Sequence, residues 1–387
     1  MKVKVNAGLL AQSLRKVTVN GNNAFCLTAD ASRKDKDGKV PVMVSSSVSG
    51  DLLPEIQAMK AFEAILLKED GANSVLLGKE FPKAVFAMEN LNKDVYITTD
   101  ENSILVSNGD AEITVPVAEN FKSISINQNE KMLGVVMERK QLQRAIKKGA
   151  AYTPEADGVV AKGAVQAKVV PEGLRIMSTN FERGAFCEVP VVGSGYIGSE
   201  EIKEPVEGSF AFRAKLLDMI LPHLSEPMVQ LVFAETMATL TCGRVSYTWV
   251  LMDKKYPDDL EKLLLNRSES IKVTVDKKEF LTAVDLADIV SEPHMPLIVE
   301  LMPESVIMVR DVNGAAKSVM PASITGTIAG GKIGLNQYNF KVIRSNLDTG
   351  EDGSFTFSTD VRAPIYFTDC TPDSVSFMMP IDLSQLK

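Results

Sequence analysis

The sequence predicts an α+β protein made of three similar domains, each with a mostly antiparallel sheet and two short helices. The main observation is a sequence pattern that occurs three times: a β-branched strand ends in a polar residue, and an amphipathic helix follows at once. The polar residues are Asn6, Glu138 and Asp276. They lie about 132 and about 138 residues apart, which is the size of a domain and not of a solenoid repeat.

The elements of each third follow in the same order. Apolar residues at helical spacing predict a helix directly after each polar residue. A second helix is predicted in each third, over Phe81–Asn92, Ala211–Ser225 and Asn336–Leu347, and Pro222 bends or ends the middle one. Each third then ends in a hairpin. The hairpins pair residues 103–106 with 112–115, 238–241 with 245–249, and 364–367 with 374–378.

Polar stretches mark the boundaries between the thirds. One runs from Asn120 to Glu130 and the other from Asn266 to Ser270, and each precedes a copy of the strand–helix pattern. We therefore predict domains at residues 1–129, 130–267 and 268–387.

Composition favours an ordinary globular protein, with 45% hydrophobic and 24% charged residues. No apolar stretch reaches the ~18 residues of a membrane span, and the first residues have no signal-peptide core, so we expect a cytoplasmic protein. The few cysteines and histidines are far apart in the sequence. We therefore expect reduced, buried thiols and neither a metal site nor a cofactor. These residues are Cys26, Cys187, Cys242, Cys370, His223 and His294.

Positive charge is concentrated on the six predicted helices. They hold 14 basic and five acidic residues, whereas the whole chain carries −8, so the helices carry +9 and the remainder −17. The helix after Glu138 is the clearest, because Lys140, Arg144, Lys147 and Lys148 lie opposite its apolar stripe. Such a face can be the ordinary solvent-exposed side of a helix, with no binding role. Its recurrence favours a surface that attracts a polyanion, and contacts to phosphates alone would let duplex DNA slide.

Four segments resemble the bacterial DNA polymerase III β subunit, the sliding clamp of replication. Residues 174–183 (LRIMSTNFER) resemble that family's L-R-x-x-x-T-D-G-H-R, and 256–258 (YPD) resemble F-P-D-Y. Residues 334–336 (GLN) resemble G-F-N, and 377–383 (FMMPIDL) resemble V-V-M-P-M-R-L. No single segment is specific, but their order and spacing match along the whole chain.

The resemblance implies a non-catalytic, homodimeric ring that encircles duplex DNA without reading its sequence and tethers polymerase and clamp-loader subunits. Sheets would form the outside, and helices would line the hole. The basic helix residues would then face DNA. They are Arg15, Lys16, Lys83, Arg139, Lys140, Arg144, Lys147, Lys148, Arg213, Lys215, Lys341 and Arg344.

The resemblance also implies a groove for short linear motifs of partner proteins, between the second and third domains. In this groove the chain departs from the family: Phe181 and Glu182 replace Gly and His, Asp382 replaces a basic residue, and residues 384–387 extend the usual end. Residues 378–380 could instead be a core strand. The groove residues would be Ala161, Thr179, Phe181, Arg183, Pro257, Met378, Met379, Pro380, Ile381 and Leu383.

The dimer contact would join an edge strand of the first domain to a helix end of the third. Its apolar residues would be Ile113 and Val115 on the strand, and Ile289 and Val290 on the helix. All four could equally belong to the core of their own domain.

Enzyme motifs are weak in this sequence. The two histidines lie beside no nucleophile motif, and there is no phosphate-binding loop. Residues 193–198 (GSGYIG) fit the spacing of a dinucleotide-binding turn, but no apolar helix pattern follows, so we expect a loop. A carboxylate pair, Asp258-Asp259, could bind a metal, but a solvated turn is the ordinary explanation. The alternative to a clamp is a β-rich hydrolase or carbohydrate-binding protein with no role on DNA.

Overall fold

The computed structural model describes most of the chain: residues 1–18, 24–50, 53–68, 74–89, 93–100, 102–118, 121, 124, 131–155, 161–197, 207–253, 256, 261–262, 271–292, 294–326, 331–347, 352–357, 363–368 and 374–385. Two compact units are present. Unit 1 comprises residues 1–140, 191–206 and 216–251, and unit 2 comprises residues 141–190, 207–215 and 252–387. No helix in the described ranges is long and apolar enough to cross a membrane.

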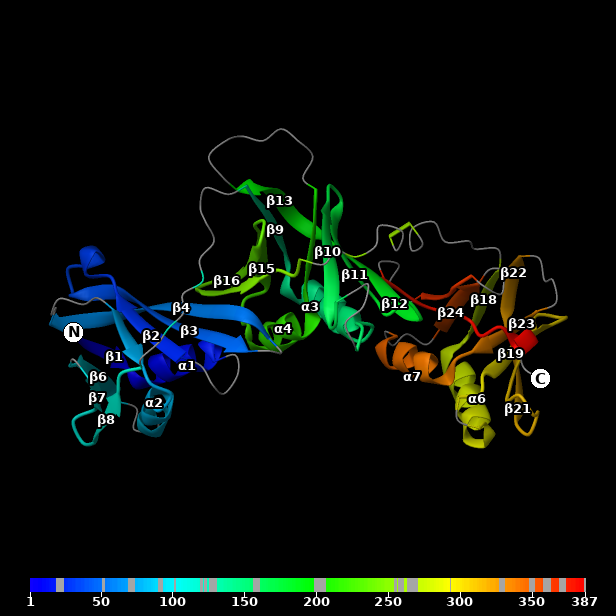
Figure 1. Ribbon diagram of the computed structural model, residues 1–387, viewed down its shortest axis with the longest axis horizontal. Coiled ribbons are helices and arrows are strands. Elements are labelled where there is room, and N and C mark those ends of the chain that lie inside the picture. Colours follow the sequence, from blue (N-terminus) through cyan, green and yellow to red (C-terminus); the bar gives the residue numbers. More distant parts are fainter. Residues whose placement is uncertain are drawn as a thin grey trace. The chain divides into compact units, whose positions relative to one another are not determined.

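Unit 1 is built on one sheet whose strands all pair antiparallel. Its main path runs β13-β9-β15-β16-β17-β4-β1-β6-β7-β8, with β2, β3 and β5 to one side (Figure 1). Helix α1 (Ala7–Val17) packs on β3 and β4 and against α2 (Phe81–Glu89). The strands are Lys2–Asn6 (β1), Ala24–Ala29 (β2), Lys39–Gly50 (β3), Leu53–Lys68 (β4), Ser74–Leu77 (β5), Asp94–Thr99 (β6), Ser103–Ser107 (β7), Glu112–Pro116 (β8), Met132–Glu138 (β9), Val191–Ile197 (β13), Met228–Phe233 (β15), Met237–Cys242 (β16) and Val245–Val250 (β17).

Unit 2 contains two antiparallel sheets. The larger runs β14-β10-β11-β12-β26-β25-β24-β18-β22, and the smaller runs β21-β20-β19-β23. The strands are Ala164–Val170 (β10), Gly173–Thr179 (β11), Arg183–Val189 (β12), Gly208–Arg213 (β14), Ile271–Asp276 (β18), Leu297–Met302 (β19), Val306–Arg310 (β20), Lys317–Pro321 (β21), Ser323–Gly326 (β22), Lys332–Leu335 (β23), Asp352–Phe357 (β24), Ile365–Thr368 (β25) and Ser374–Met378 (β26).

The other helices lie close to the predicted positions. They are α3 (Arg139–Ala150), α4 (Ala214–Ile220), α6 (Lys277–Val290) and α7 (Gln337–Asn346), with short 3₁₀ turns η1 (Ala31–Arg33), η2 (Leu221–His223) and η3 (Leu383–Gln385). Helices α6 and α7 join through an aromatic cluster in the core of unit 2. The ring of Phe340 lies 5.8 Å from that of Phe280 and 5.7 Å from that of Phe367.

The structure confirms the repeated strand–helix pattern: a helix begins directly after each of the three polar residues. In two of its copies the polar residue accepts a hydrogen bond from the first turn of its helix: Asn6 Oδ1 from the Leu9 amide at 3.0 Å, and Asp276 Oδ1 from the Glu279 amide at 2.7 Å. Such N-caps satisfy amides that the helix itself leaves without partners. In the remaining copy, β9 ends at Glu138 and α3 begins at Arg139.

The predicted hairpins are also confirmed. Strands β7 and β8 pair Ile104 with Val115, β16 pairs with β17, and β25 pairs with β26. In the first hairpin Asn108 Oδ1 accepts hydrogen bonds from two following backbone amides, and Gly109 has a φ of 91°. A glycine suits that position because it has no Cβ to clash.

Two predictions about local structure are wrong. The middle helix begins at Ala214 and not at Ala211, because residues 208–213 pair with β10 as strand β14. Residues 193–197 form no loop: they belong to β13, paired antiparallel with β9. Its glycines carry no side chain that would reveal alternation, and a strand there is not the turn that a dinucleotide needs.

Strand pairing links the thirds of the chain. In unit 1, β17 pairs with β4 from Val245↔Lys60 to Trp249↔Ile56. In unit 2, β12 pairs with β26 from Arg183↔Met378 to Cys187↔Ser374. The predicted second third therefore contributes strands to both units.

Candidate nucleic-acid interface and partner groove

The cations of α1 and α2 are partly neutralised. Arg15 Nη1 donates to Glu89 Oε1 at 2.8 Å, and its guanidinium lies 4.9 Å from the centre of the Phe86 ring. The hydrogen bond to Arg15 lowers the pKa of Glu89, so the carboxylate stays charged. Lys16 Nζ donates to Ser225 Oγ at 3.3 Å, and Lys83 is exposed on α2.

Helix α3 presents fewer cations to solvent than its sequence pattern predicts. Lys140 and Lys147 are exposed, and Arg144 is half-buried. Lys148 is only 4% exposed, and its Nζ donates to the hydroxyl of Ser374 on β26, so its predicted place on the exposed face is wrong. The cause is its position in the helix, which turns its side chain toward the larger sheet of unit 2.

Arg139 and Arg213 also differ from the other predicted cations. Arg139 Nη1 donates to the carbonyl of Leu224 at 2.7 Å, and its amide donates to the Pro227 carbonyl at 2.8 Å, so it holds the chain after η2 in place. Arg213 is the last residue of β14 and half-buried, not a helix residue. Lys215, on α4, is exposed.

The two basic residues of α7 pair with acids of α6. Lys341 Nζ lies 2.8 Å from Asp288 Oδ2, and Arg344 hydrogen-bonds Asp285. Among the described residues, the predicted DNA-facing cations that are exposed and form no ion pair are Lys83, Lys140, Lys147 and Lys215. These four are therefore the best candidates for contacts to phosphates.

Burial of Lys148 leads to a prediction about stability. Lys148→Glu should lower the free energy of unfolding by about 2–4 kcal/mol, because a buried carboxylate would replace an ammonium that has a hydroxyl partner. The neighbouring Lys147→Glu should change it by less than about 0.5 kcal/mol, since Lys147 is exposed. Urea unfolding of both variants measures the difference. Equal losses would mean that Lys148 is exposed in solution.

The predicted partner groove is centred on the turn between β11 and β12. Thr179 Oγ1 donates to the Arg183 carbonyl and accepts from the Phe181 amide, both at 2.9 Å, and Asn180 Oδ1 accepts from the amides of Glu182 and Arg183. Phe181 has a φ of 73° and is 52% exposed. A residue with an aromatic side chain rarely adopts a positive φ, because this backbone conformation is strained for residues other than glycine.

Arg183 fastens this turn to α7. It is 3% exposed, its Nη1 donates to Asn339 Oδ1 at 2.7 Å, and its guanidinium lies 4.8 Å from the centre of the Tyr338 ring. Glu182 completes the contact, because its side chain accepts from Asn339 Nδ2 at 3.3 Å and its carbonyl accepts from the Met379 amide at 2.7 Å. Arg183 thus has a structural role, with its charge largely withdrawn from solvent.

The C-terminal segment lies next to the same turn. Met378 is fully buried at the end of β26, which agrees with the alternative of a core strand for this residue, whereas residues 379–383 are half-buried. The Ile381 amide donates to the Gly334 carbonyl at 2.9 Å. A Cβ at Gly334 would lie 2.6 Å from the Ile381 carbonyl oxygen, so only glycine allows this approach.

The remaining groove residues divide into core and undescribed positions. Ala161 is 4% exposed and belongs to an apolar cluster with Met177, Phe186 and Tyr256. Pro257 and the carboxylates at 258–259 lie outside the described residues. Unit 2 therefore brings together Thr179, Phe181, Arg183 and residues 378–383, as the groove prediction requires. Of these predicted residues, Phe181 is exposed and residues 379–383 are half-buried, whereas Thr179, Arg183 and Met378 are buried.

Solved structures resemble this chain along its whole length. No family model and no curated protein sequence matches it. The DNA polymerase III subunit beta of Pseudomonas aeruginosa has a TM-score of 0.75 at 16% identity, and the same clamp bound to griselimycin has 0.74 at 17%. The beta sliding clamp of C. crescentus has 0.73 at 18%. Each comparison covers 99% of this chain and 100% of the other. The chain has the fold of a bacterial sliding clamp.

On this clamp fold, the residues predicted for the dimer contact are unequally placed. Ile113 is 42% exposed on β8, the last strand of its sheet path, whereas Val115 is 2% exposed and packs inside unit 1. Ile289 and Val290 are 78% and 44% exposed at the end of α6. Val115 therefore belongs to the core of its own unit, as the alternative allowed, and the other three remain candidates.

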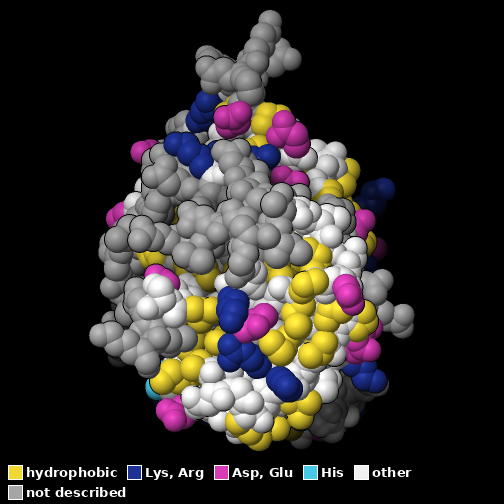
Figure 2. Space-filling model, turned by 90° about the vertical axis from the view of Figure 1, so that its right-hand side faces the viewer, with side chains coloured by type: hydrophobic (Ala, Val, Ile, Leu, Met, Phe, Trp, Pro, Cys, Tyr) yellow, Lys and Arg dark blue, Asp and Glu magenta, His cyan; other side chains and the backbone are white. Residues whose placement is uncertain are grey.

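An apolar surface surrounds the end of α6. Leu286 on α6 and Val319 on β21, the strand against which α6 packs, are 50% and 59% exposed. Figure 2 shows hydrophobic side chains gathered on the lower part of the face at this end of the molecule. Exposed apolar side chains gathered near one another are typical of an interaction site.

Sequence reasoning counted the acids of the predicted helices but did not pair Asp285 and Asp288 with the basic residues of α7. Asp285 and Asp288 are three residues apart on α6, as are Lys341 and Arg344 on α7. That matching spacing was the available signal, because residues three apart share a helix face. Asn339, the partner of Arg183, has no signal beyond its place one turn into α7.

Proposed function

We propose that the protein is a DNA sliding clamp, a homodimeric ring of cytoplasmic subunits that encircles duplex DNA and tethers a polymerase and a clamp loader. It acts without catalysing a reaction and without a cofactor, and its subunit consists of the three domains at 1–129, 130–267 and 268–387. The observation that carries the proposal is the match of the whole chain to sliding clamps from end to end. One fold can serve several functions, so the charges of the helices and a test on DNA must support the proposal as well.

The charge distribution supports this function. The chain is acidic overall, with a net charge of −8, yet Lys83, Lys140, Lys147 and Lys215 are exposed on α2, α3 and α4. A ring that holds DNA by topology needs only weak, sequence-independent contacts to phosphates, which must be exchanged as it slides. A few exposed lysines on an otherwise acidic protein suit that requirement better than an extensive basic surface would.

Retention on DNA tests the proposal. The protein should stay on circular duplex DNA after loading and leave when the DNA is cut to a linear form, because a ring can slide off a free end. Gel filtration through a column that excludes the DNA measures the fraction that remains bound. Equal retention on circular and linear DNA would refute encirclement, and hydrolysis of a carbohydrate or ester by the purified monomer would favour the enzyme alternative.

Phe181 should distinguish partner binding from stability. Phe181→Gly should stabilise the fold by up to about 1 kcal/mol, because glycine adopts a φ of 73° without strain. The same variant should weaken capture of the partner polymerase at least fivefold, since it removes the largest exposed side chain of the groove. Thermal unfolding and surface plasmon resonance measure the two effects. Weaker stability with unchanged capture would show that Phe181 serves the fold and not the partner.

Gly334→Ala should disturb the C-terminal half of the groove. The added methyl group would meet the Ile381 carbonyl and the Leu383 side chain, so residues 381–383 must move away. We expect at least a fivefold loss of polymerase capture, with a retained dimer. The control is Gly193→Ala on β13, where an added Cβ meets no atom within 4 Å, and this variant should bind the polymerase normally. Gly314→Ala would be unsuitable as a control, because the positive φ of Gly314 would strain an alanine.

A further inference from the structure

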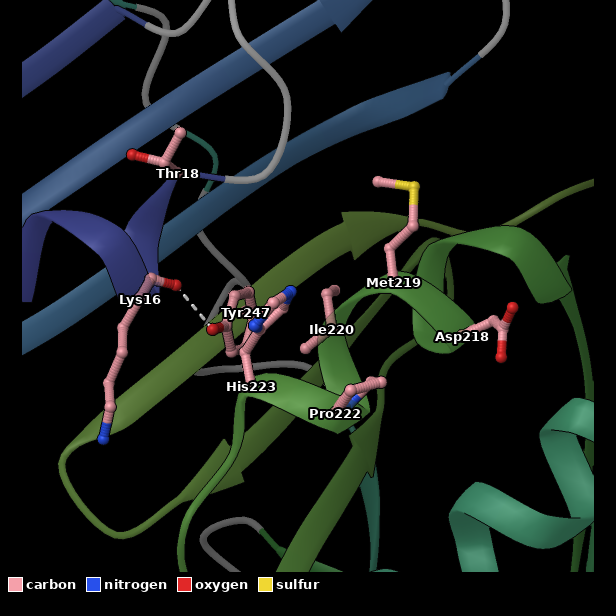
Figure 3. A pocket seen from close by; sticks show the side chains of 8 residues that line it. All are labelled: Lys16, Thr18, Asp218, Met219, Ile220, Pro222, His223 and Tyr247. Atoms are coloured by element: carbon pink, nitrogen blue, oxygen red, sulfur yellow. Dashed lines mark hydrogen bonds between the residues drawn. The ribbon is translucent and has the colours of Figure 1, made fainter.

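The two units differ in what they present to a partner protein. In unit 1, a pocket of about 350 Å³ lies where the end of α1 meets α4, η2 and β17 (Figure 3). Ile220 and Tyr247, which line it, are each 2% exposed, and the charged ends of Lys16 and Asp218 point away from its centre. The pocket therefore presents neither of these charges to an occupant. In unit 2, by contrast, the turn at 179–183 contains an exposed aromatic residue next to an exposed acidic one.

Glu182 is that acidic residue, and its backbone is held firmly in the turn. Its amide donates to Asn180 Oδ1 at 3.1 Å, and its carbonyl accepts from the Met379 amide at 2.7 Å. Within the described structure its side chain has one partner, Asn339, whose Nδ2 donates to Oε2 at 3.3 Å. An ionised carboxylate can accept about four hydrogen bonds. Glu182 can therefore accept further donors from a bound partner while its backbone stays in place.

The neighbouring residues show how this region already binds a guanidinium group. The guanidinium of Arg183 lies 4.8 Å from the centre of the Tyr338 ring, and its Nη2 lies 3.9 Å from Glu155 Oε1. The Tyr338 hydroxyl donates to the same oxygen at 3.1 Å. A ring and a carboxylate together suit an arginine, because its planar group stacks on the ring while its N–H groups pair with the acid.

Phe181 and Glu182 offer the same combination of groups to solvent. Phe181 is 52% exposed, and within the described residues neither it nor Glu182 has a cationic partner. Their Cα atoms are about 3.8 Å apart, as in any pair of neighbours, so the ring and the carboxylate can contact one guanidinium together. A side chain bound there would also remove the ring from water, which is favourable.

The charge of this surface favours a basic peptide over a nucleic acid. Glu155 and Glu182 are exposed carboxylates, whereas Arg183 is only 3% exposed. Asp382, in the adjoining C-terminal segment, is half-buried and adds a further negative charge. The exposed cation nearest to Glu155 in the sequence, Lys162, takes part in an interaction of its own. Exposed carboxylates repel phosphates and attract a basic side chain.

We propose that this surface makes the protein select partner motifs in which an arginine adjoins a large apolar side chain. The guanidinium would pair with the Glu182 carboxylate and stack on the Phe181 ring, and the apolar side chain would lie on the half-buried residues 379–381. This preference rests on the proposed function, because it concerns the motif by which a clamp would hold its polymerase. Phe181 and Glu182 would then determine specificity, while Arg183 keeps the turn in place.

Selection from random peptides tests this preference without assuming a partner. The full chain is immobilised and exposed to a phage library of random nine-residue peptides, and the bound peptides are sequenced. Arginine next to Leu, Ile, Met or Phe should be enriched at least fivefold over the unselected library, and Asp and Glu should be depleted at that position. The same selection on the variant Glu182→Arg should lose the arginine enrichment.

Purified peptides then measure the contact itself. A selected peptide and its twin with Arg replaced by Gln are labelled with fluorescein, and fluorescence anisotropy gives their Kd values. The twin should bind the unaltered chain at least fivefold more weakly. Glu182→Gln should reduce this difference to less than twofold, because the arginine then loses its charged partner. The glutamine oxygen can still accept from Asn339, so the variant should fold normally, which circular dichroism checks.

Glu172→Gln is the matched control. Glu172 is an exposed acid of unit 2 in the turn between β10 and β11, at the end of β11 opposite to Thr179. This variant should preserve the full difference between the two peptides. Phe181→Leu keeps an apolar side chain but removes the ring, and it should weaken binding of the arginine peptide at least threefold.

Three results would overturn the proposal. One is a selection that enriches acidic motifs or no motif. Another is equal binding of the arginine peptide and its glutamine twin. The last is an equal effect of Glu172→Gln and Glu182→Gln, which would remove the role of this turn. Retention on circular DNA depends on none of these peptides, so a chain that is retained but shows no arginine preference would leave the clamp proposal standing.

Discussion

Reversing the charge of Lys140, Lys147 and Lys215 to Glu should lower retention on circular DNA at least tenfold at moderate salt. These lysines are exposed on α3 and α4, where within the described structure no ion pair neutralises them. Each lost phosphate contact should reduce the slope of log K against log salt by about 0.9. The fold should be unaffected, since exposed charges contribute little to stability.

The control uses cations that already have acidic partners. Lys341→Gln with Arg344→Gln removes two positive charges from α7, but Asp288 and Asp285 then lose their partners as well. The net charge of α6 and α7 becomes more negative. Because Lys341 and Arg344 are already paired with acids, few contacts to DNA should be lost, and retention should fall less than threefold. An equal loss in both variants would mean that the cations of α7 contribute to DNA binding as much as those of α3 and α4, and the assignment of particular helices would be wrong.

Introducing carboxylates at the end of α6 should separate the proposed dimer. Ile289→Asp with Val290→Asp would place two charges in the apolar surface that also includes Leu286 and Val319. Burying such charges in an interface without partners costs several kcal/mol, enough to shift dissociation at least a hundredfold. The mass in solution should fall toward the 42.1 kDa of one chain, and retention on circular DNA should disappear with it.

Val192→Asp supplies the control for this experiment. Val192 is 75% exposed on β13 of unit 1, and nothing links it to the predicted contact. The control should remain dimeric in sedimentation velocity. If the α6 variant also remained dimeric and loaded onto DNA, Ile289 and Val290 would not lie in the interface.

Local structure could be predicted from this sequence because its signals are local. Asn6 and Asp276 cap helices that start on the next residue, and the Asn108-Gly109 turn determines its hairpin. Arg213 was misplaced because F-A-F-R, the end of β14, has apolar residues that also fit a helix extended backward from α4. Burial of Lys148 depends on Ser374, more than 200 residues away, which no helical wheel reveals.

The candidate site could be predicted only in part for a similar reason. The turn at 179–183 was found through its resemblance to a family motif, but the contact of Arg183 with Asn339 joins segments that no local pattern connects. The pairing of β17 with β4 and of β12 with β26 is equally remote in sequence. Long-range pairing of this kind depends on the whole fold.

Those two pairings have a mechanical consequence. Each joins successive thirds of the chain by a ladder of five paired residues, so pulling the thirds apart would break several main-chain hydrogen bonds at once. The edge strand β8 and the end of α6 have no such ladder within the described chain. If the protein forms the proposed ring and a loader opens it, we expect the opening to occur at the contact between subunits, with each subunit remaining intact.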